Sequence, residues 1–301
     1  MKAVIFSHYG GAEVLRLVEL EKPRPGPGEV RIKVSAAGVN PSDWKRRKGL
    51  YREFEEVVFP SGVGVEAAGV VDAIGPAVSG VTVGDAVFGY GRATVAEYAC
   101  LSKWVAKPSG LPCEVAGGLA VTSETALRGL DDLGMKANEW LLISGAAGGI
   151  GAAAVQFARH RGIIVIGTAS ERNQAYLQEL GAIPTTYGPG LAERVRALAP
   201  HGIDAAFDVA GSGIISELIG IVGVASRVVS VADLSAEKYG ARFSKGPPRE
   251  PERVLAEVAK LYCEGQFQAR VERTFSIEQT AEAHAISEAG HASGKLVICM
   301  P

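Results

Sequence analysis

The chain has 301 residues, with 31 lysines and arginines against 33 aspartates and glutamates, and its net charge is −2. This length favours two domains, and 47% hydrophobic with 21% charged residues is typical of a globular protein with a sizeable core. The balanced charge gives no reason to expect a nucleic-acid partner. A membrane span needs about 18 consecutive apolar residues, and no apolar run in the sequence is nearly that long.

The N-terminus and the cysteines favour a cytoplasmic protein. Ala3–Phe6 is strand-like and charged residues follow soon after it, so the segment does not resemble a signal peptide. The cysteines are scattered without paired spacing: Cys100, Cys113, Cys263 and Cys299. We therefore predict a reducing, cytoplasmic environment and no disulfide framework.

The first hundred residues predict short strands separated by turns. Strands are expected at Val30–Val34 and Ala67–Ile74, and a strand, a turn and a second strand at Val81–Gly89. Glycine and proline punctuate these runs, with a stiff turn at Pro23–Gly28. Many short strands of this kind indicate a barrel-like β domain.

The pattern changes near residue 112, where a helix is expected at Glu114–Leu130. From residue 140, strands and helices alternate, which predicts a parallel sheet covered on both faces. The strands are expected at Trp140–Ser144, Ile163–Thr168, Ile203–Asp208 and Arg227–Val231, and the helices at Ile150–Arg161, Arg172–Leu180, Leu191–Leu198 and Ile214–Val222.

A boundary is expected at residues 246–251, which read G-P-P-R-E-P. Just before it, Phe243 and Ser244 can form a short pairing strand. The remaining elements are expected at Arg253–Cys263 (helix), Val271–Phe275 (strand), Ile277–Ala289 (helix) and Lys295–Cys299 (strand).

A glycine-rich segment lies between the predicted strand 140–144 and the helix after it. It has the spacing A-x-G-x-x-G, with Ala146 at the first glycine position. Gly148 lets the backbone approach a pyrophosphate, and Gly151 lets the helix pack closely on the strand. A plain turn is the alternative, but the strand, loop, helix and second strand together predict a dinucleotide-binding site.

The end of the second strand carries information about the cofactor. An NAD site usually has an acid here, whereas this chain has Ala169 and Ser170, followed by Arg172. We therefore predict that a 2′-phosphate is accepted and that the cofactor is NADPH. Ser170 can also be the N-cap of the next helix, and Glu171, one place late, keeps NAD as an alternative.

Six segments of the chain carry recognisable motifs: Ala36–Asp43, Gly62–Val71, Gly84–Val87, Ala146–Gly151, Phe207–Gly211 and Gly294–Val297. Taken together, they resemble the zinc-independent quinone oxidoreductases of the medium-chain dehydrogenase/reductase superfamily, the ζ-crystallin-like group. The resemblance implies an α/β protein with two domains and a homodimer. A GroES-like β domain (residues 1–112 and 250–301) would enclose a Rossmann domain with a doubly wound parallel sheet (113–249).

Zinc-dependent members of the superfamily place a cysteine and a histidine where this chain has Asn40 and Val65. Only Cys100 and Cys113 lie near the region of the structural zinc lobe, which needs four cysteines. The histidines show no metal-ligand spacing: His8, His160, His201, His284 and His291. We therefore predict that the protein needs no metal.

The resemblance also implies the site residues. Asn40 and Tyr51 would be the catalytic residues beside the nicotinamide; the alternatives are a turn residue before Pro41 and an exposed loop aromatic. Asp43 is expected to pin the loop, and Thr122 to contact the nicotinamide side or to cap a helix. The residues predicted to bind the cofactor are Thr122, Ala146, Ala147, Gly148, Gly149, Ile150, Gly151, Ser170, Arg172, Tyr187 and Lys295.

A site without a metal suits a soft electrophile, because a quinone or an α,β-unsaturated carbonyl spreads the charge that hydride transfer creates. We therefore predict NADPH-dependent reduction of such a small-molecule substrate. The alternatives are an enoyl-thioester or pathway-specific enone reductase of the same family, and a cofactor-binding module without turnover.

Overall fold

The computed structural model describes residues 1–53, 55–290 and 292–301, so His291 lies outside the described residues. The chain divides into two compact units, one of Met1–Val121 with Glu250–Pro301 and the other of Thr122–Arg249. The boundaries expected from the sequence, 112/113 and 249/250, stay predictions. The first boundary between the compact units, Val121/Thr122, lies nine residues after the expected one, and the second coincides with the expected boundary.

Antiparallel strands dominate the first unit. β3 (Val30–Val39), β5 (Glu66–Ile74), β6 (Ala86–Gly91) and β7 (Tyr98–Ala106) pair in that order, and β7 also pairs with β3, which closes the barrel. β15 (Lys295–Cys299) then adds antiparallel to β3. The enclosed core includes Val30, Ile32, Val34, Val71, Val87 and Leu101.

The remaining strands of this unit extend the barrel. β14 (Val271–Ser276) pairs parallel with β15, while β1 (Lys2–Phe6), β2 (Arg16–Glu19) and β4 (Ser61–Gly62) form a separate sheet. The helices of the unit are α1 (Pro41–Arg47), α2 (Cys113–Ala116), α8 (Pro251–Cys263) and α9 (Thr280–Ala289). The C-terminal segment therefore completes a sheet that the N-terminal segment begins.

The second unit contains a parallel sheet in the order β10-β9-β8-β11-β12-β13, which in chain order is the 3-2-1-4-5-6 arrangement of a Rossmann fold. The strands are β8 (Trp140–Ser144), β9 (Ile164–Ala169), β10 (Ile183–Thr186), β11 (Ala205–Asp208), β12 (Val228–Ser230) and β13 (Arg242–Phe243).

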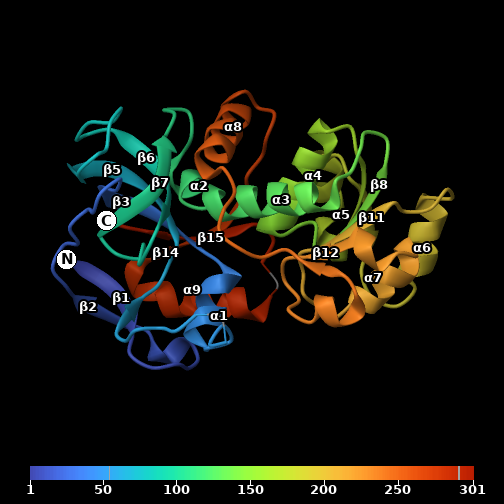
Figure 1. Ribbon diagram of the computed structural model, residues 1–301, viewed down its shortest axis with the longest axis horizontal. Coiled ribbons are helices and arrows are strands. Elements are labelled where there is room, and N and C mark those ends of the chain that lie inside the picture. The colour runs from blue at the N-terminus through green and yellow to red at the C-terminus, as the bar shows by residue number, and fades with distance from the viewer. Residues whose placement is uncertain (54, 291) are drawn as a thin grey trace. The chain divides into compact units, whose positions relative to one another are not determined.

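Helices lie alongside this sheet (Figure 1). They are α4 (Gly149–His160), α5 (Gln174–Leu180), α6 (Leu191–Leu198) and α7 (Ile215–Val222), and α3 (Leu119–Leu133) enters the unit from the first boundary. The two-domain α/β architecture predicted from the sequence is confirmed.

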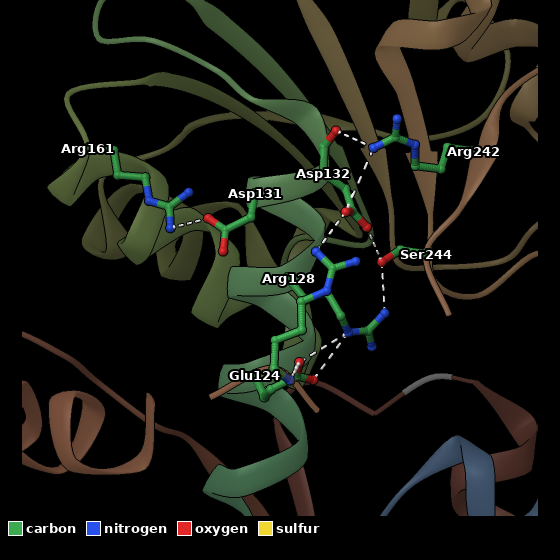
Figure 2. A network of polar contacts seen from close by, with 8 residues as sticks. Glu124, Arg128, Asp131, Asp132, Arg161, Arg242 and Ser244 are labelled. Carbon is green, nitrogen blue, oxygen red and sulfur yellow. Dashed lines mark hydrogen bonds and ion pairs between the residues drawn. The ribbon is translucent and has the colours of Figure 1, made fainter. Parts of the chain in front are cut away.

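Polar contacts fasten the last segment of the second unit to α3 (Figure 2). Ser244 Oγ donates to Asp132 Oδ2 at 2.5 Å and accepts from Arg128 Nη1 at 2.8 Å. Arg128 in turn forms an ion pair with Glu124, with Nε 3.2 Å from Oε1. The short strand expected near residue 243 forms as β13, and these contacts hold the chain just after it.

Two expectations about the elements are wrong. Val81–Val83 is not a strand, because Asp85 Oδ2 accepts from the Thr82 amide at 2.7 Å and closes a turn. The expected helix 114–130 is two helices, α2 and α3, separated at Gly117 and Gly118. A Cβ on Gly117 would lie 2.7 Å from the Ala36 carbonyl oxygen, so the chain here packs against β3.

Candidate functional site

A tight loop joins β8 to α4 in the second unit. Gly145 takes a left-handed conformation, with φ of +79°, and its amide donates to Thr168 Oγ1 at 3.2 Å. The Ala146 amide donates to the Thr168 carbonyl oxygen at 2.9 Å. These bonds tie the loop to the end of β9. The first amides of α4 have no acceptor within the helix, and together with the helix dipole they favour a bound phosphate.

The two glycines of the motif are required for different reasons. A Cβ on Gly148 would have the Gly145 carbonyl oxygen as its nearest neighbour, at 3.5 Å, so this position is open. A Cβ on Gly151 would lie 2.3 Å from that oxygen and 2.6 Å from Ala146 Cα. Gly151 therefore serves the packing of helix on strand, whereas Gly148 leaves space in front of the loop.

The predicted 2′-phosphate residues lie at neighbouring strand ends. Thr186 of β10 pairs with Ala169 of β9, so Tyr187 and Ser170 follow paired residues at the same edge of the sheet. Tyr187 is 58% exposed, and Arg172 is also exposed, in the short turn after Ser170.

The other groups at these strand ends have local roles. Ser170 Oγ accepts from Asn173 Nδ2 at 3.1 Å. Ser170 is the N-cap of the short 3₁₀ turn Glu171–Asn173, whereas the N-cap of α5 is Asn173 and not the expected Ser170. Gln174 Nε2 donates to backbone carbonyl oxygens, including that of Thr185 at 3.2 Å. Arg172 and Tyr187 stay the candidate 2′-phosphate residues, because both are exposed at this edge of the sheet.

Sequence reasoning missed a buried pair at the ends of β11 and β12. Ser230 Oγ donates to Asp208 Oδ2 at 2.7 Å, and Asp208 Oδ1 accepts from the Gly211 amide at 3.1 Å. A Cβ on Gly145 would lie 3.0 Å from Ala210 Cβ, so the turn that Asp208 holds packs on the phosphate loop. The F-D-x-A-G motif was the available signal, but its aspartate has no obvious partner in the sequence.

Asn40 lies in the first unit at the junction of β3 and α1, and its side chain is only 2% exposed. Its backbone amide donates to Asp43 Oδ2 at 2.7 Å, and its side-chain Nδ2 donates to Glu66 Oε1 at 2.8 Å. Lys295 Nζ donates to Asn40 Oδ1 at 2.5 Å. Asn40 is thus the N-cap of a helix, and both ends of its amide are engaged.

Glu66 is a further residue that sequence reasoning missed, although it stands in a recognised motif. It is fully buried, and its Oε1 lies 2.7 Å from Lys295 Nζ. Its Oε2 accepts from the Val121 amide at 2.9 Å, at the first boundary of the unit. Lys295, predicted to bind the cofactor, contacts Glu66 and Asn40; its role toward a cofactor stays a prediction.

The titratable groups near Asn40 are strongly affected by burial. Burial raises the pKa of Asp43 from 3.8 to about 7. The pKa of Tyr51, which is half-buried in the turn after α1, is raised by burial and then by the Asp43 charge. Tyr51 is therefore a weaker acid than a free phenol. Thr122 lies buried inside α3, so its alternative role as a helix N-cap is wrong.

The donor set does not fit a catalytic zinc ion. Asn40 Oδ1 is taken by the Lys295 ammonium, and Val65 offers no ligand. Within residues 1–53, 55–290 and 292–301, no group of three or more His, Cys, Asp or Glu side chains could hold a metal ion. Over the same ranges, no helix has the length and apolar character of a membrane span.

Two family models match parts of the chain. Residues 26–124 match the model described as the alcohol dehydrogenase GroES-like domain, and residues 186–298 match the model described as zinc-binding dehydrogenase.

Curated relatives match almost the whole chain. A 2-methylene-furan-3-one reductase of Solanum lycopersicum is 30% identical, covering 99% of this chain and 79% of the relative. A quinone oxidoreductase of Pseudomonas aeruginosa is 29% identical and covers 99% of each. Two Streptomyces polyketide synthase proteins are 31% and 33% identical over 91% and 93% of this chain, which spans only 13% and 8% of their length.

Solved structures share the fold over the whole chain. A quinone oxidoreductase from Coxiella burnetii has a TM-score of 0.85 at 29% identity, covering 100% of this chain and 99% of the other. A mycobacterial protein in complex with NADPH has a TM-score of 0.87 at 26% identity, covering 99% and 100%. The enoyl reductase CurK has a TM-score of 0.88 at 26% identity, covering 100% and 99%.

Proposed function

The chain belongs to the quinone oxidoreductase group of the medium-chain dehydrogenase/reductase superfamily, and we propose that it uses NADPH to reduce a quinone or an α,β-unsaturated carbonyl without a metal. The observation that carries this proposal is the loop Gly145–Gly151. Gly148 leaves open space at the N-terminus of α4, where a pyrophosphate would bind, while backbone contacts confine Gly151.

The choice of NADPH is supported by the neighbouring strand ends. Neither Ala169 nor Ser170 has a carboxylate that would repel a 2′-phosphate, and Arg172 follows with a permanent positive charge. Tyr187 leaves the adjacent strand at the same edge. A solved relative in complex with NADPH agrees with this preference.

The proposed independence from zinc is supported by what surrounds Asn40. A hydride acceptor develops negative charge on its carbonyl oxygen, and some group must stabilise that charge. Asn40 and Tyr51 are the donors that this chain offers in place of a metal. We expect a quinone or enone to need less help than a simple ketone, because conjugation spreads its charge.

Enoyl-thioester reduction is the second candidate, and the similarity to an enoyl reductase favours it. A module that binds cofactor without turnover is the third. The homodimer and the cytoplasmic location stay predictions.

The test is consumption of NADPH with a panel of 1,4-quinones, enones and enoyl thioesters, before and after dialysis against a strong chelator. We expect saturable turnover with a quinone or enone that survives dialysis. Tight NADPH binding with no oxidation by any acceptor would favour the binding module. Activity that is lost on dialysis and restored by zinc would refute the metal-free reaction.

A further inference from the structure

Three side chains from distant parts of the sequence form a closed ring in the first unit. Lys295 Nζ donates to Asn40 Oδ1 at 2.5 Å and lies 2.7 Å from Glu66 Oε1, and Asn40 Nδ2 donates to that same oxygen at 2.8 Å. Glu66 is fully buried, and Asn40 and Lys295 are 2% and 8% exposed. Such a ring brings together β3, β5 and β15.

Charge determines the orientation of the amide within this ring. The oxygen of Asn40 faces an ammonium, which can only donate, and its nitrogen faces a carboxylate, which can only accept. Turning the amide over would place Nδ2 against the Lys295 ammonium and Oδ1 against the Glu66 carboxylate. Both contacts would then be repulsive, so the pair admits one orientation.

Close packing prevents the pair from moving away. A Cβ on Gly38 would lie 2.4 Å from Glu66 Oε1, and a Cβ on Gly118 would lie 2.5 Å from Lys295 Cγ. Glu66 Oε2 is also held by the Val121 amide at 2.9 Å. The carboxylate and the ammonium are therefore confined by backbone on several sides.

We propose that Glu66 and Lys295 are positioning residues that orient and polarise the Asn40 amide for the reduction proposed above. The ammonium draws electron density toward Oδ1, which makes Nδ2 a stronger hydrogen-bond donor. One hydrogen of Nδ2 is used by Glu66, and the second is the one that Asn40 can offer. This inference rests on the proposed function for its catalytic consequence, but the orientation itself can be tested without turnover.

The retention of a buried ion pair agrees with such a role. Well-packed apolar side chains often replace a buried pair with no loss of stability, whereas removing one partner leaves an uncompensated charge. Fold stability alone therefore gives a weak reason for Glu66 and Lys295, and a dipole that must point one way gives a stronger one.

The test uses the small number of asparagines. The sequence has only three, Asn40, Asn138 and Asn173. Selective ¹⁵N-asparagine labelling therefore gives three side-chain NH₂ pairs by NMR, with the second and third as internal references. Spectra are compared for wild type, Glu66→Gln, Lys295→Met and the double variant, with Asn40→Ser used to assign the signal.

We expect the Asn40 pair to shift and to exchange faster with solvent in both single variants, while the reference pairs stay in place. In turnover assays, kcat should fall about 10- to 100-fold with little change in KM for NADPH. The double variant, which buries no unpaired charge, should recover thermal stability but not kcat. Asp72→Asn, which breaks the Arg31–Asp72 pair between the same strands β3 and β5, is the matched control and should keep both kcat and the Asn40 signal.

An unmoved Asn40 signal in the single variants would overturn the inference. Recovery of both stability and kcat in the double variant would do so too, because it would mean that the pair is only structural. If none of the acceptors makes the wild type oxidise NADPH, the proposed function fails. The NMR comparison then still decides whether the Glu66–Lys295 pair orients Asn40.

Discussion

Replacing Asp43 by asparagine removes a buried acid whose ionisation the fold disfavours. Burial raises the pKa of Asp43 to about 7 from its ordinary 3.8. Each tenfold change in an acid constant corresponds to ~1.4 kcal/mol, so ionised Asp43 lowers the free energy of unfolding by about 4 kcal/mol relative to the protonated form. Because folding raises this pKa, the stability conferred by the proton is fully present below pH 3.8 and is lost as the pH rises through about 7.

The advantage of Asp43→Asn over wild type should therefore grow by about 2–3 kcal/mol between roughly pH 5 and pH 8. Asparagine keeps an oxygen that can accept from the Asn40 amide, now at 2.7 Å from Asp43 Oδ2, so the helix N-terminus should survive. The assay is urea unfolding followed by tryptophan fluorescence at a series of pH values. Asp85→Asn, at an exposed turn, is the control and should run parallel to wild type. Parallel curves for Asp43→Asn and wild type would refute the reasoning.

Three further outcomes follow from the same geometry. Gly148→Ala should leave thermal unfolding unchanged but weaken NADPH binding. Gly151→Ala should destabilise the fold by about 1–3 kcal/mol, because its Cβ would lie 2.3 Å from the Gly145 carbonyl oxygen. Equal loss of stability in both variants would contradict this. Arg172→Ala should reduce the preference for NADPH over NADH in kcat/KM by about 10- to 150-fold, and an unchanged ratio would move the 2′-phosphate contact elsewhere. Burial lowers the pKa of His284 from 6.5 to about 4, so its stabilising effect is present above pH 6.5 and is lost as the pH falls through about 4. The free energy of unfolding of His284→Gln should fall less steeply toward acid pH than that of wild type. If the two proteins lose stability equally at acid pH, the imidazole of His284 is not buried in its neutral form.

Local patterns predicted the elements of the second unit well. The bounds of Trp140–Ser144 and Leu191–Leu198 agree with the structure to the residue, because a buried strand and an amphipathic helix each carry their own hydrophobic period. The phosphate loop was equally readable, since its glycines meet requirements within a few residues. Cofactor chemistry could therefore be predicted where both partners of a contact are neighbours in sequence.

Two elements that contain a proline were not predicted from the sequence. Pro184 lies in Ile183–Thr186, and β10 is the edge of its sheet, where a missing N–H can face away from the neighbour. Pro41 occupies the first position of α1, where its fixed φ suits a helix. In both cases the position of the proline within the fold decided the outcome, and local composition does not contain that position.

The site around Asn40 could not be assembled from sequence for a different reason. Lys295 lies 255 residues from Asn40, and the contact exists only because β15 pairs with β3 after the whole second unit has intervened. The motif containing Glu66 was recognisable, but a motif does not state which ion its carboxylate pairs with. Sequence reasoning consequently placed Lys295 among the cofactor-binding residues and gave Glu66 no role.

Charge balance connects Asp43 to the ring formed by Asn40, Glu66 and Lys295. The Glu66 carboxylate and the Lys295 ammonium cancel, so the buried cluster is neutral only while Asp43 holds a proton. Lys295 and the partly exposed Arg46 lower the pKa of Asp43, but Glu66 raises it and burial outweighs them all. An ionised Asp43 would add a second negative charge that attracts the Lys295 ammonium and would weaken its pull on the Asn40 oxygen. A protonated Asp43 is thus the state in which the ion pair acts on the amide without competition.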